Sequence, residues 1–265
     1  MDDPAQADDA PIPPTTRPWT AVGPREAPAI VFLHGTRFSR RQWWPQMRHL
    51  SARYRCVAVD LPGHGERAGE PWSFEAARAA VITAIEVEVP SGRAVIVGLS
   101  LGGYVAIDVA EAAPDRVAGL VLAGCSGEAF GTMAIPFRVL ARTFERVSPA
   151  TLRLLNVAYF RLRYPPSIAE PIIDGGFWWN GGAQAVRSIV GRHFLDRLGR
   201  LWTPVLIVNG ALDPVFGPGG EFWAATCRHG RSVVIKRAMH LSSLDRPRAF
   251  SRHVARFTDA VSGRA

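Results

Sequence analysis

Residues 94–106 read AVIVGLSLGGYVA, an apolar run that breaks at one serine and resumes as a helical pattern. A chain that passes from a buried strand to a helix within two or three residues forces Ser100 into unfavourable backbone dihedrals. Gly98 and Gly102 lack the side chains that would clash at such a turn, and Gly103 lets the helix approach the sheet. The stretch therefore predicts a serine hydroxyl displayed on a sharp turn, beside the free N–H groups of a helix N-terminus.

Short apolar runs rich in β-branched residues alternate with helical patterns along the chain. The runs are AIVFL (29–33), CVAVD (56–60), AVIVG (94–98), VAGLVLAG (117–124), PVLIVNG (204–210) and SVVIKRA (232–238), and the helical patterns cover 42–53, 74–88, 101–112, 220–228 and 246–260. Near-continuous hydrophobicity indicates strands covered on both faces, and the alternation is typical of right-handed crossover units. We predict an α/β fold, with a mostly parallel central β-sheet and helices on both faces.

The interval 126–200 interrupts this alternation with about 75 residues between the fourth and fifth runs. It is rich in aromatic residues, and a structureless loop of this length is uncommon. We predict an inserted helical cap over the carboxyl ends of the strands, where open parallel sheets bind ligands. The core then comprises residues 19–125 and 201–265. Residues 1–18, with four aspartates and five prolines, are predicted to be a disordered N-terminal tail.

The net charge of +8 comes from 31 basic residues, of which Lys236 is the one lysine. The arginines are scattered, without a block of like charges or a nucleic-acid-binding module, so we predict no nucleic-acid binding. The interval 126–200 nevertheless holds ten arginines against five acidic residues. This local excess favours an acidic partner or substrate, such as an acidic carrier protein.

The three cysteines (Cys56, Cys125 and Cys227) are widely spaced and lack any C-x-x-C pattern. We interpret them as core residues rather than as a disulfide framework or a metal site, and we predict neither a metal nor a cofactor. The sequence has no signal-peptide pattern and no apolar run of about 18 residues. These features predict a cytoplasmic protein without a membrane span.

A serine hydroxyl is a poor nucleophile until a base removes its proton, so Ser100 requires a histidine and a carboxylate. Asp213 lies three residues past the run PVLIVNG, and His240 lies just past the last run. Taken singly, an aspartate after a strand is usually a turn or cap residue, and a lone histidine is usually structural. The joint placement at strand ends, in the order Ser…Asp…His, favours a catalytic triad. Asp245 is a weaker alternative because it is placed to cap the last helix.

An oxyanion hole requires two N–H donors close to the serine. We predict the backbone N–H of Leu101, directly after the nucleophile, and that of Thr36, because Gly35 lets the loop after the first run pass near the turn. His34 and His64 are interpreted as structural hydrogen-bonding residues rather than catalysts.

Taken together, the motifs LHGTRFSRRQW (33–43), VAVDLPGHGER (57–67), IVGLSLGGYVA (96–106), VNGALDP (208–214) and AMHLSSLDRP (238–247) make the chain resemble the α/β-hydrolase fold superfamily. The match spans about residues 28 to 260. The resemblance implies a Ser100–Asp213–His240 triad, an oxyanion hole from Thr36 and Leu101, and a helical cap at 126–200. The chain departs from the family pattern in two places. An N-terminal antiparallel strand pair is barely visible, and Arg37 stands where many relatives have a small or apolar residue.

We therefore expect a serine hydrolase that cleaves a carboxylic ester or lactone of a small apolar or aromatic substrate through an acyl-enzyme. We expect substrate contacts from Phe38 and from the aromatic cap residues Tyr159, Trp178 and Trp179, and a pairing of Arg37 with a substrate carboxylate. Other chemistries remain open because function resides in the site rather than the fold. They include a thioesterase acting on a carrier-bound acyl group, C–C bond hydrolysis, haloperoxidase-like, lyase or cofactor-free oxygenase chemistry, and a ligand sensor with negligible turnover.

Overall fold

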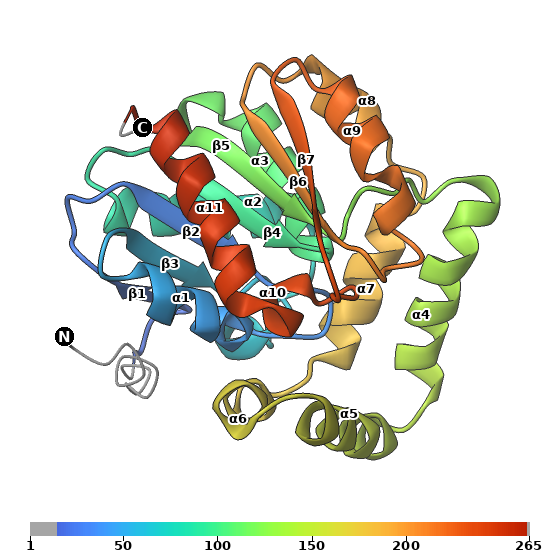
Figure 1. The fold of residues 1–265 in the computed structure, drawn as a ribbon. Coiled ribbons are helices and arrows are strands. Elements are labelled where there is room, and N and C mark those ends of the chain that lie inside the picture. The colour runs from blue at the N-terminus through green and yellow to red at the C-terminus, as the bar shows by residue number, and fades with distance from the viewer. Residues whose placement is uncertain (1–14, 264–265) are drawn as a thin grey trace.

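A single sheet of seven strands forms the centre of the computed structural model, which describes residues 15–263 (Figure 1). The strands are β1 (Trp19–Val22), β2 (Ala29–Leu33), β3 (Arg55–Val59), β4 (Ala94–Leu99), β5 (Val117–Ala123), β6 (Val205–Gly210) and β7 (Gly230–Ile235). Their order in the sheet is β1-β3-β2-β4-β5-β6-β7. Because β1 alone among them pairs antiparallel, the predicted mostly parallel sheet is confirmed.

Helices cover both faces of this sheet, and further helices flank the ends of its strands. They are α1 (Trp44–Leu50), α2 (Phe74–Glu88), α3 (Leu101–Ala112), α4 (Ala134–Arg146), α5 (Pro149–Arg163), α6 (Pro166–Asp174), α7 (Trp179–Ile189), α8 (Phe194–Arg200), α9 (Gly220–Thr226), α10 (Ser242–Asp245) and α11 (Pro247–Val261). Successive strand residues face opposite sides, so Ile30 packs in the apolar cluster that contains α1 and α11, while Val31 packs in the one that contains α2, α3 and α9. Within residues 15–263, no helix is long and apolar enough to cross a membrane.

The interval 126–200 carries the five helices α4 to α8 between β5 and β6. In Figure 1, α4 to α7 stand beside and below the lower ends of the strands. Helix α6 lies against α1, and its Ile172 and Ile173 pack in the same apolar cluster as α1 and α11. Helix α8 instead packs on α3, where the rings of Phe194 and Tyr104 lie 4.7 Å apart between centroids. The interval thus supplies four helices that flank the sheet and one that joins the core layer.

The N-terminal region is attached to the sheet by polar contacts. Of the predicted tail, residues 1–14 lie outside the described residues, whereas Arg17 pairs with Glu88 at 2.7 Å and the carbonyl of Pro18 accepts a 2.9 Å hydrogen bond from Asp60 N. Trp19 begins β1 and donates its indole N–H to Glu88 at 2.9 Å. The antiparallel strand that the sequence barely reveals is therefore β1.

A buried ion pair holds the loop after β2 to the turn after β3. Arg40, 10% exposed in its side chain, donates to Asp60, whose side chain is fully buried. The carboxylate of Asp60 also accepts the backbone N–H of Arg40 at 2.7 Å and that of Glu66 at 3.0 Å. This network fixes the segment that contains Thr36 relative to the sheet.

We expect Arg40→Ala to lower the free energy of unfolding by about 3–5 kcal/mol, because it leaves the Asp60 carboxylate buried without its cation. Arg53→Ala is the control, since Arg53 makes an exposed ion pair with Asp259 at 3.1 Å that is worth at most about 1 kcal/mol. Urea unfolding followed by circular dichroism measures both losses. Equal losses of unfolding free energy in the two variants would contradict a stabilising role for the buried Arg40–Asp60 pair.

Candidate active site

The turn between β4 and α3 has the strained backbone that the sequence predicts. Ser100 adopts φ 52° and ψ −114°, a region that residues with side chains rarely occupy. A Cβ placed on Gly98 would overlap the backbone of Gly102, and one placed on Gly103 would overlap the side chain of Cys125. The small residues therefore permit the turn, and Ser100 lies at the carboxyl end of the central strand.

Asp213 and His240 form the second part of the site. Asp213 lies in the turn after β6, and His240 lies in the loop after β7. His240 Nδ1 is 2.9 Å from Asp213 Oδ2, while the other carboxylate oxygen accepts the backbone N–H groups of Val215 at 3.0 Å and Phe216 at 3.1 Å. These bonds orient the carboxylate toward the imidazole.

The Asp213 carboxylate stays ionised despite its burial. Burial acts to raise its pKa, but the hydrogen bond and charge of His240 and the N–H groups of Phe216 and Val215 outweigh that effect. The pKa of Asp213 is therefore held below its usual range. Such a carboxylate can fix the tautomer of His240 and stabilise its protonated form.

The imidazole of His240 is held between two neighbours. Its ring stacks on Phe216 with centroids 5.1 Å apart. On Gly124, whose φ is +56°, a Cβ would come within 2.9 Å of the imidazole. Both His240 and Ser100 line one cavity. Within the described residues Ser100 Oγ has no hydrogen-bond partner, and such contacts often tighten only when substrate binds.

The two backbone N–H groups predicted as oxyanion donors belong to residues at this site. Leu101 is the first residue of α3, and Thr36 lines the same cavity as Ser100. Across residues 15–263, neither N–H has a hydrogen-bond partner. The Thr36 carbonyl lies 2.7 Å from His64 Nε2, and the His34 ring accepts the N–H of Leu61 at 3.0 Å. The two buried histidines thus position the loop through structural hydrogen bonds.

The cavity beside Ser100 has a volume of about 320 Å³. Its polar side is formed by Ser100, Thr36, Asp213 and His240. The apolar side chains that face them come from the inserted helices and from the turn after β6; they are Pro136, Phe137, Leu140, Val186, Ile189, Pro214, Val215 and Phe216. The cavity therefore combines a serine hydroxyl, an imidazole and a carboxylate with an apolar wall.

The five residues predicted to contact substrate lie outside this lining. Phe38, Tyr159 and Trp179 belong to a network of aromatic rings that also includes Phe160 and Phe177. This network packs the inserted helices against the loop after β2. The structure does not bring its rings to Ser100.

Arg37 and Trp178 also connect the loop to the inserted helices. The N–H of Trp178 donates to the Arg37 carbonyl at 2.9 Å, and Arg37 Nε donates to Asn156 of α5 at 2.8 Å. Burial lowers the pKa of Arg37 to about 10, which leaves it charged at neutral pH. The guanidinium therefore bridges to α5 and does not line the cavity.

The sequence analysis missed the apolar wall formed by α4 and α7. One signal was present: residues 137, 140, 141 and 144, in the first part of the interval 126–200, are apolar at the spacing of one helix face. Phe137 is one of many aromatic residues in the interval 126–200, and an aromatic position alone does not show whether the side chain faces the site or packs between helices.

A strained strand-to-helix turn at Ser100, a paired Asp–His and a mostly parallel sheet are typical of hydrolases of the α/β class, and comparison with known proteins agrees. The model of the alpha/beta hydrolase family matches residues 30–253. The chain therefore belongs to the α/β-hydrolase family. The resemblance predicted from the sequence is confirmed, as is the prediction that the chain is an enzyme.

Similar curated and solved proteins include esterases. A pimeloyl-[acyl-carrier protein] methyl ester esterase of Neisseria meningitidis serogroup C is 29% identical over 263 residues, covering 88% of this chain and 93% of that protein. The structure of a thermophilic esterase from Thermogutta terrifontis superimposes with a TM-score of 0.75 at 25% identity, covering 92% and 93% of the two chains. An enol-lactonase from Burkholderia xenovorans, with a TM-score of 0.69, 23% identity and coverage of 90% and 95%, shares the fold.

We expect Asp213→Asn to lower kcat by about 10⁴-fold, because the amide no longer favours the required tautomer of His240. Since the folded-state pKa of Asp213 is depressed, its stabilising contribution is present above about pH 4 and is lost as the pH falls through the folded pKa. The difference in unfolding free energy between wild type and variant should therefore shrink below about pH 4. Urea titrations at several pH values measure it, and a difference that grows on acidification would contradict the assignment.

Proposed function

We propose that this chain is a serine esterase in which Ser100 attacks the carbonyl carbon of a carboxylic ester. The observation that supports this function most directly is the strained Ser100 turn in the same cavity as the Asp213–His240 pair. The esterases among the similar proteins support the same reaction type.

In the proposed reaction, His240 takes the Ser100 proton as the serine oxygen bonds to the carbonyl carbon. The N–H groups of Leu101 and Thr36 stabilise the resulting oxyanion, and each such donor is worth about 3 kcal/mol. His240 then protonates the departing alcohol, which leaves an acyl group on Ser100. Water activated by His240 releases the acid and restores the enzyme.

The dimensions of the cavity favour a small substrate. A volume of about 320 Å³ lies at the lower end of the range typical of ligand sites, about 300–1,000 Å³. Phe137, Leu140, Val186 and Ile189 provide an apolar surface for one end of the ester. We therefore propose short apolar acyl or alkyl groups as the part that enters the cavity.

We expect wild type to hydrolyse p-nitrophenyl acetate and butyrate faster than the dodecanoate, and Ser100→Ala to lose at least about a thousandfold in kcat. A fluorophosphonate probe should label wild type at residue 100, as located by peptide mass spectrometry. Thr143→Ala removes a half-buried hydroxyl on α4 that donates to the Val139 carbonyl and does not line the cavity; it serves as the matched control and should retain both properties. A Ser100→Ala variant whose kcat equals that of wild type would refute the mechanism. Labelling without turnover of any ester would favour a ligand sensor.

A second observation favours an ester that is delivered by an acidic carrier protein. On α4 and α5, the exposed side chains of Arg138, Arg142 and Arg153 make no ion pair within residues 15–263. Exposed leucines lie among them, with Leu154 68% and Leu155 60% exposed. Since α4 also supplies Phe137 and Leu140 to the cavity, an acidic partner bound here would stand next to the site. The carrier named in the curated relatives supports this proposal.

We expect the double variant Arg138→Glu/Arg142→Glu to lower kcat/KM for a carrier-bound methyl ester by about tenfold or more at low salt, because both charges would repel an acidic carrier. Its activity on p-nitrophenyl acetate should stay within about twofold. Arg200→Glu, an exposed arginine on α8 of the same interval, is the matched control. Equal effects of both variants on the carrier-bound ester would contradict docking on α4, while leaving the esterase proposal intact.

A further inference from the structure

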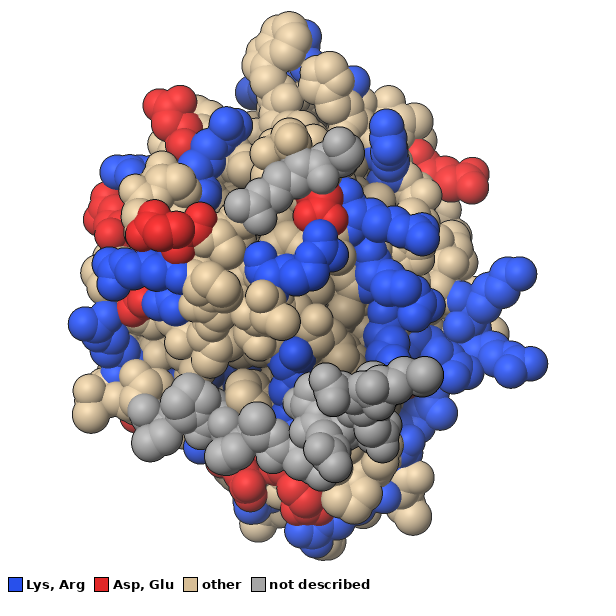
Figure 2. All heavy atoms as spheres, turned by 60° about the vertical axis from the view of Figure 1, so that its left-hand side comes forward, with Lys and Arg blue, Asp and Glu red and all other residues tan. Residues whose placement is uncertain are grey.

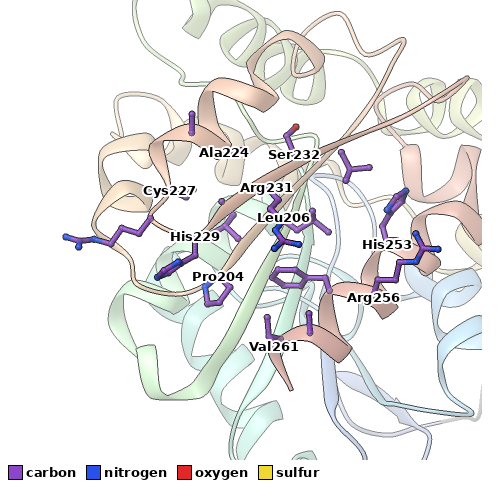
Figure 3. Close-up of a pocket in the computed structure, with 17 residues that line it drawn as sticks. Pro204, Leu206, Ala224, Cys227, His229, Arg231, Ser232, His253, Arg256 and Val261 are labelled. Carbon is purple, nitrogen blue, oxygen red and sulfur yellow. The ribbon is translucent and has the colours of Figure 1, made fainter. Parts of the chain in front are cut away.

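A second groove lies at the opposite ends of the strands from Ser100. It has a volume of about 680 Å³ and is bounded by the beginnings of β6 and β7 together with α9 and α11 (Figure 3). Pro204, Leu206 and Val261 contribute apolar surface, while Arg231, His253 and Arg256 contribute charge or titratable nitrogen. We call this surface the edge groove. It shares no lining residue with the catalytic cavity.

The edge groove includes an unpaired strand edge. β7 ends the sheet and pairs with β6 alone within residues 15–263. His229 and Ile235 accept hydrogen bonds toward β6, from Val205 N and Ala211 N at 2.9 Å each. Because bonding alternates along a parallel strand, the N–H and C=O groups of Ser232 point away from β6. An extended peptide can pair with such an edge.

The charged residues of the edge groove have no acidic counterpart. Among the described residues, neither Arg231 nor Arg256 makes an ion pair or a hydrogen bond, and both are exposed. Arg252 precedes Arg256 by one helical turn, so two like charges repel each other on α11. Burial together with Arg256 and Arg252 lowers the pKa of His253. Figure 2 shows Lys and Arg gathered along one side of the molecular surface, with few Asp or Glu among them.

The apolar floor and the charged rim lie on the same side of the sheet. Leu206 belongs to the apolar cluster under α11, and Val233 and Phe257 pack against it. Arg231 and Val233 are two residues apart on β7 and therefore face the same side. Figure 3 shows Arg231 reaching over the groove near Leu206, with Arg256 and His253 side by side on α11. A peptide strand along β7 would place alternate side chains on this floor and rim.

We propose that the edge groove binds an extended acidic segment of a partner protein, which pairs with the free edge of β7 and places carboxylates against Arg231 and Arg256. A second copy of this chain fits less well, because a two-fold contact through β7 would bring the same arginines of both copies together. The esterase site faces the other ends of the strands, so both sites can be occupied at once.

The test uses the full chain as immobilised target for a library of random ten-residue peptides. We expect enrichment of Asp- and Glu-rich sequences, and no such enrichment on Arg231→Glu/Arg256→Glu. The best peptide, labelled with fluorescein, should bind Arg231→Ala/Arg256→Ala about tenfold or more weakly than wild type in fluorescence anisotropy. Arg25→Ala/Arg200→Ala removes two exposed arginines elsewhere and is the matched control, expected to bind within about twofold of wild type.

Strand pairing is tested by modifying the peptide rather than the protein, so the folding of the protein is unaffected. N-methylation of alternate amides on its β7-facing side should abolish binding, whereas methylation of the other alternate amides should not. Hydrolysis of p-nitrophenyl acetate by each protein variant shows that it is folded. The proposal is overturned if no acidic sequences are enriched, if both methylated peptides bind equally, or if the arginine variants bind as wild type. If Arg231→Ala/Arg256→Ala bound the peptide as wild type but lost self-association, the groove would be assigned to a second copy of the chain. If the variant instead lost binding to anionic vesicles, the groove would be assigned to a membrane surface. Either result would overturn the proposal.

Discussion

The backbone at residue 100 has to turn from β4 into α3 within one residue, with φ at 52°. Several neighbouring residues are small, and they permit this turn. Gly98 and Gly102 leave room for the turn, and Gly103 lets α3 lie against the loop that contains Cys125. Because strain of this kind costs about 1–3 kcal/mol, it persists only where the rest of the fold supports it. Here the support is the buried sheet on both sides of β4.

Asp213 and His240 line the same cavity as Ser100 because parallel strands end at the same edge. Asp213 follows β6 and His240 follows β7, so the sheet brings residues that are 140 positions apart in sequence into one site. Gly124, after β5, provides space for the imidazole. The Arg40–Asp60 pair fixes the loop that carries Thr36. The proposed reaction thus depends on loops that begin at the carboxyl ends of the buried sheet strands.

The fold could be predicted because its signals are local, and so could the meeting of Asp213 and His240 in one cavity with Ser100. A glycine pattern specifies a turn, an apolar run specifies a strand, and chain order then limits which residues can meet. The substrate contacts could not be predicted in this way. Phe38, Tyr159 and Trp179 are aromatic and lie in or near the inserted segment, yet they pack on Phe160 and Phe177 rather than facing Ser100. Which ring faces a cavity depends on how α4 to α7 pack together, and no spacing within one helix determines that.

The charge distribution shows the same limit of sequence analysis. Ten arginines in the interval 126–200 indicate a basic surface, but a count does not show which of them are neutralised. In the structure Arg161 and Arg187 are paired with Glu170 and Glu145, whereas Arg138 and Arg142 are not. The edge groove, with Arg231 and Arg256, was not visible at all, because its charges come from β7 and α11, which are separated in sequence. Among the described residues, unpaired arginines thus flank two separate hollows, the cavity beside Ser100 and the edge groove at the far ends of the strands. An acidic partner at either surface would leave the other accessible.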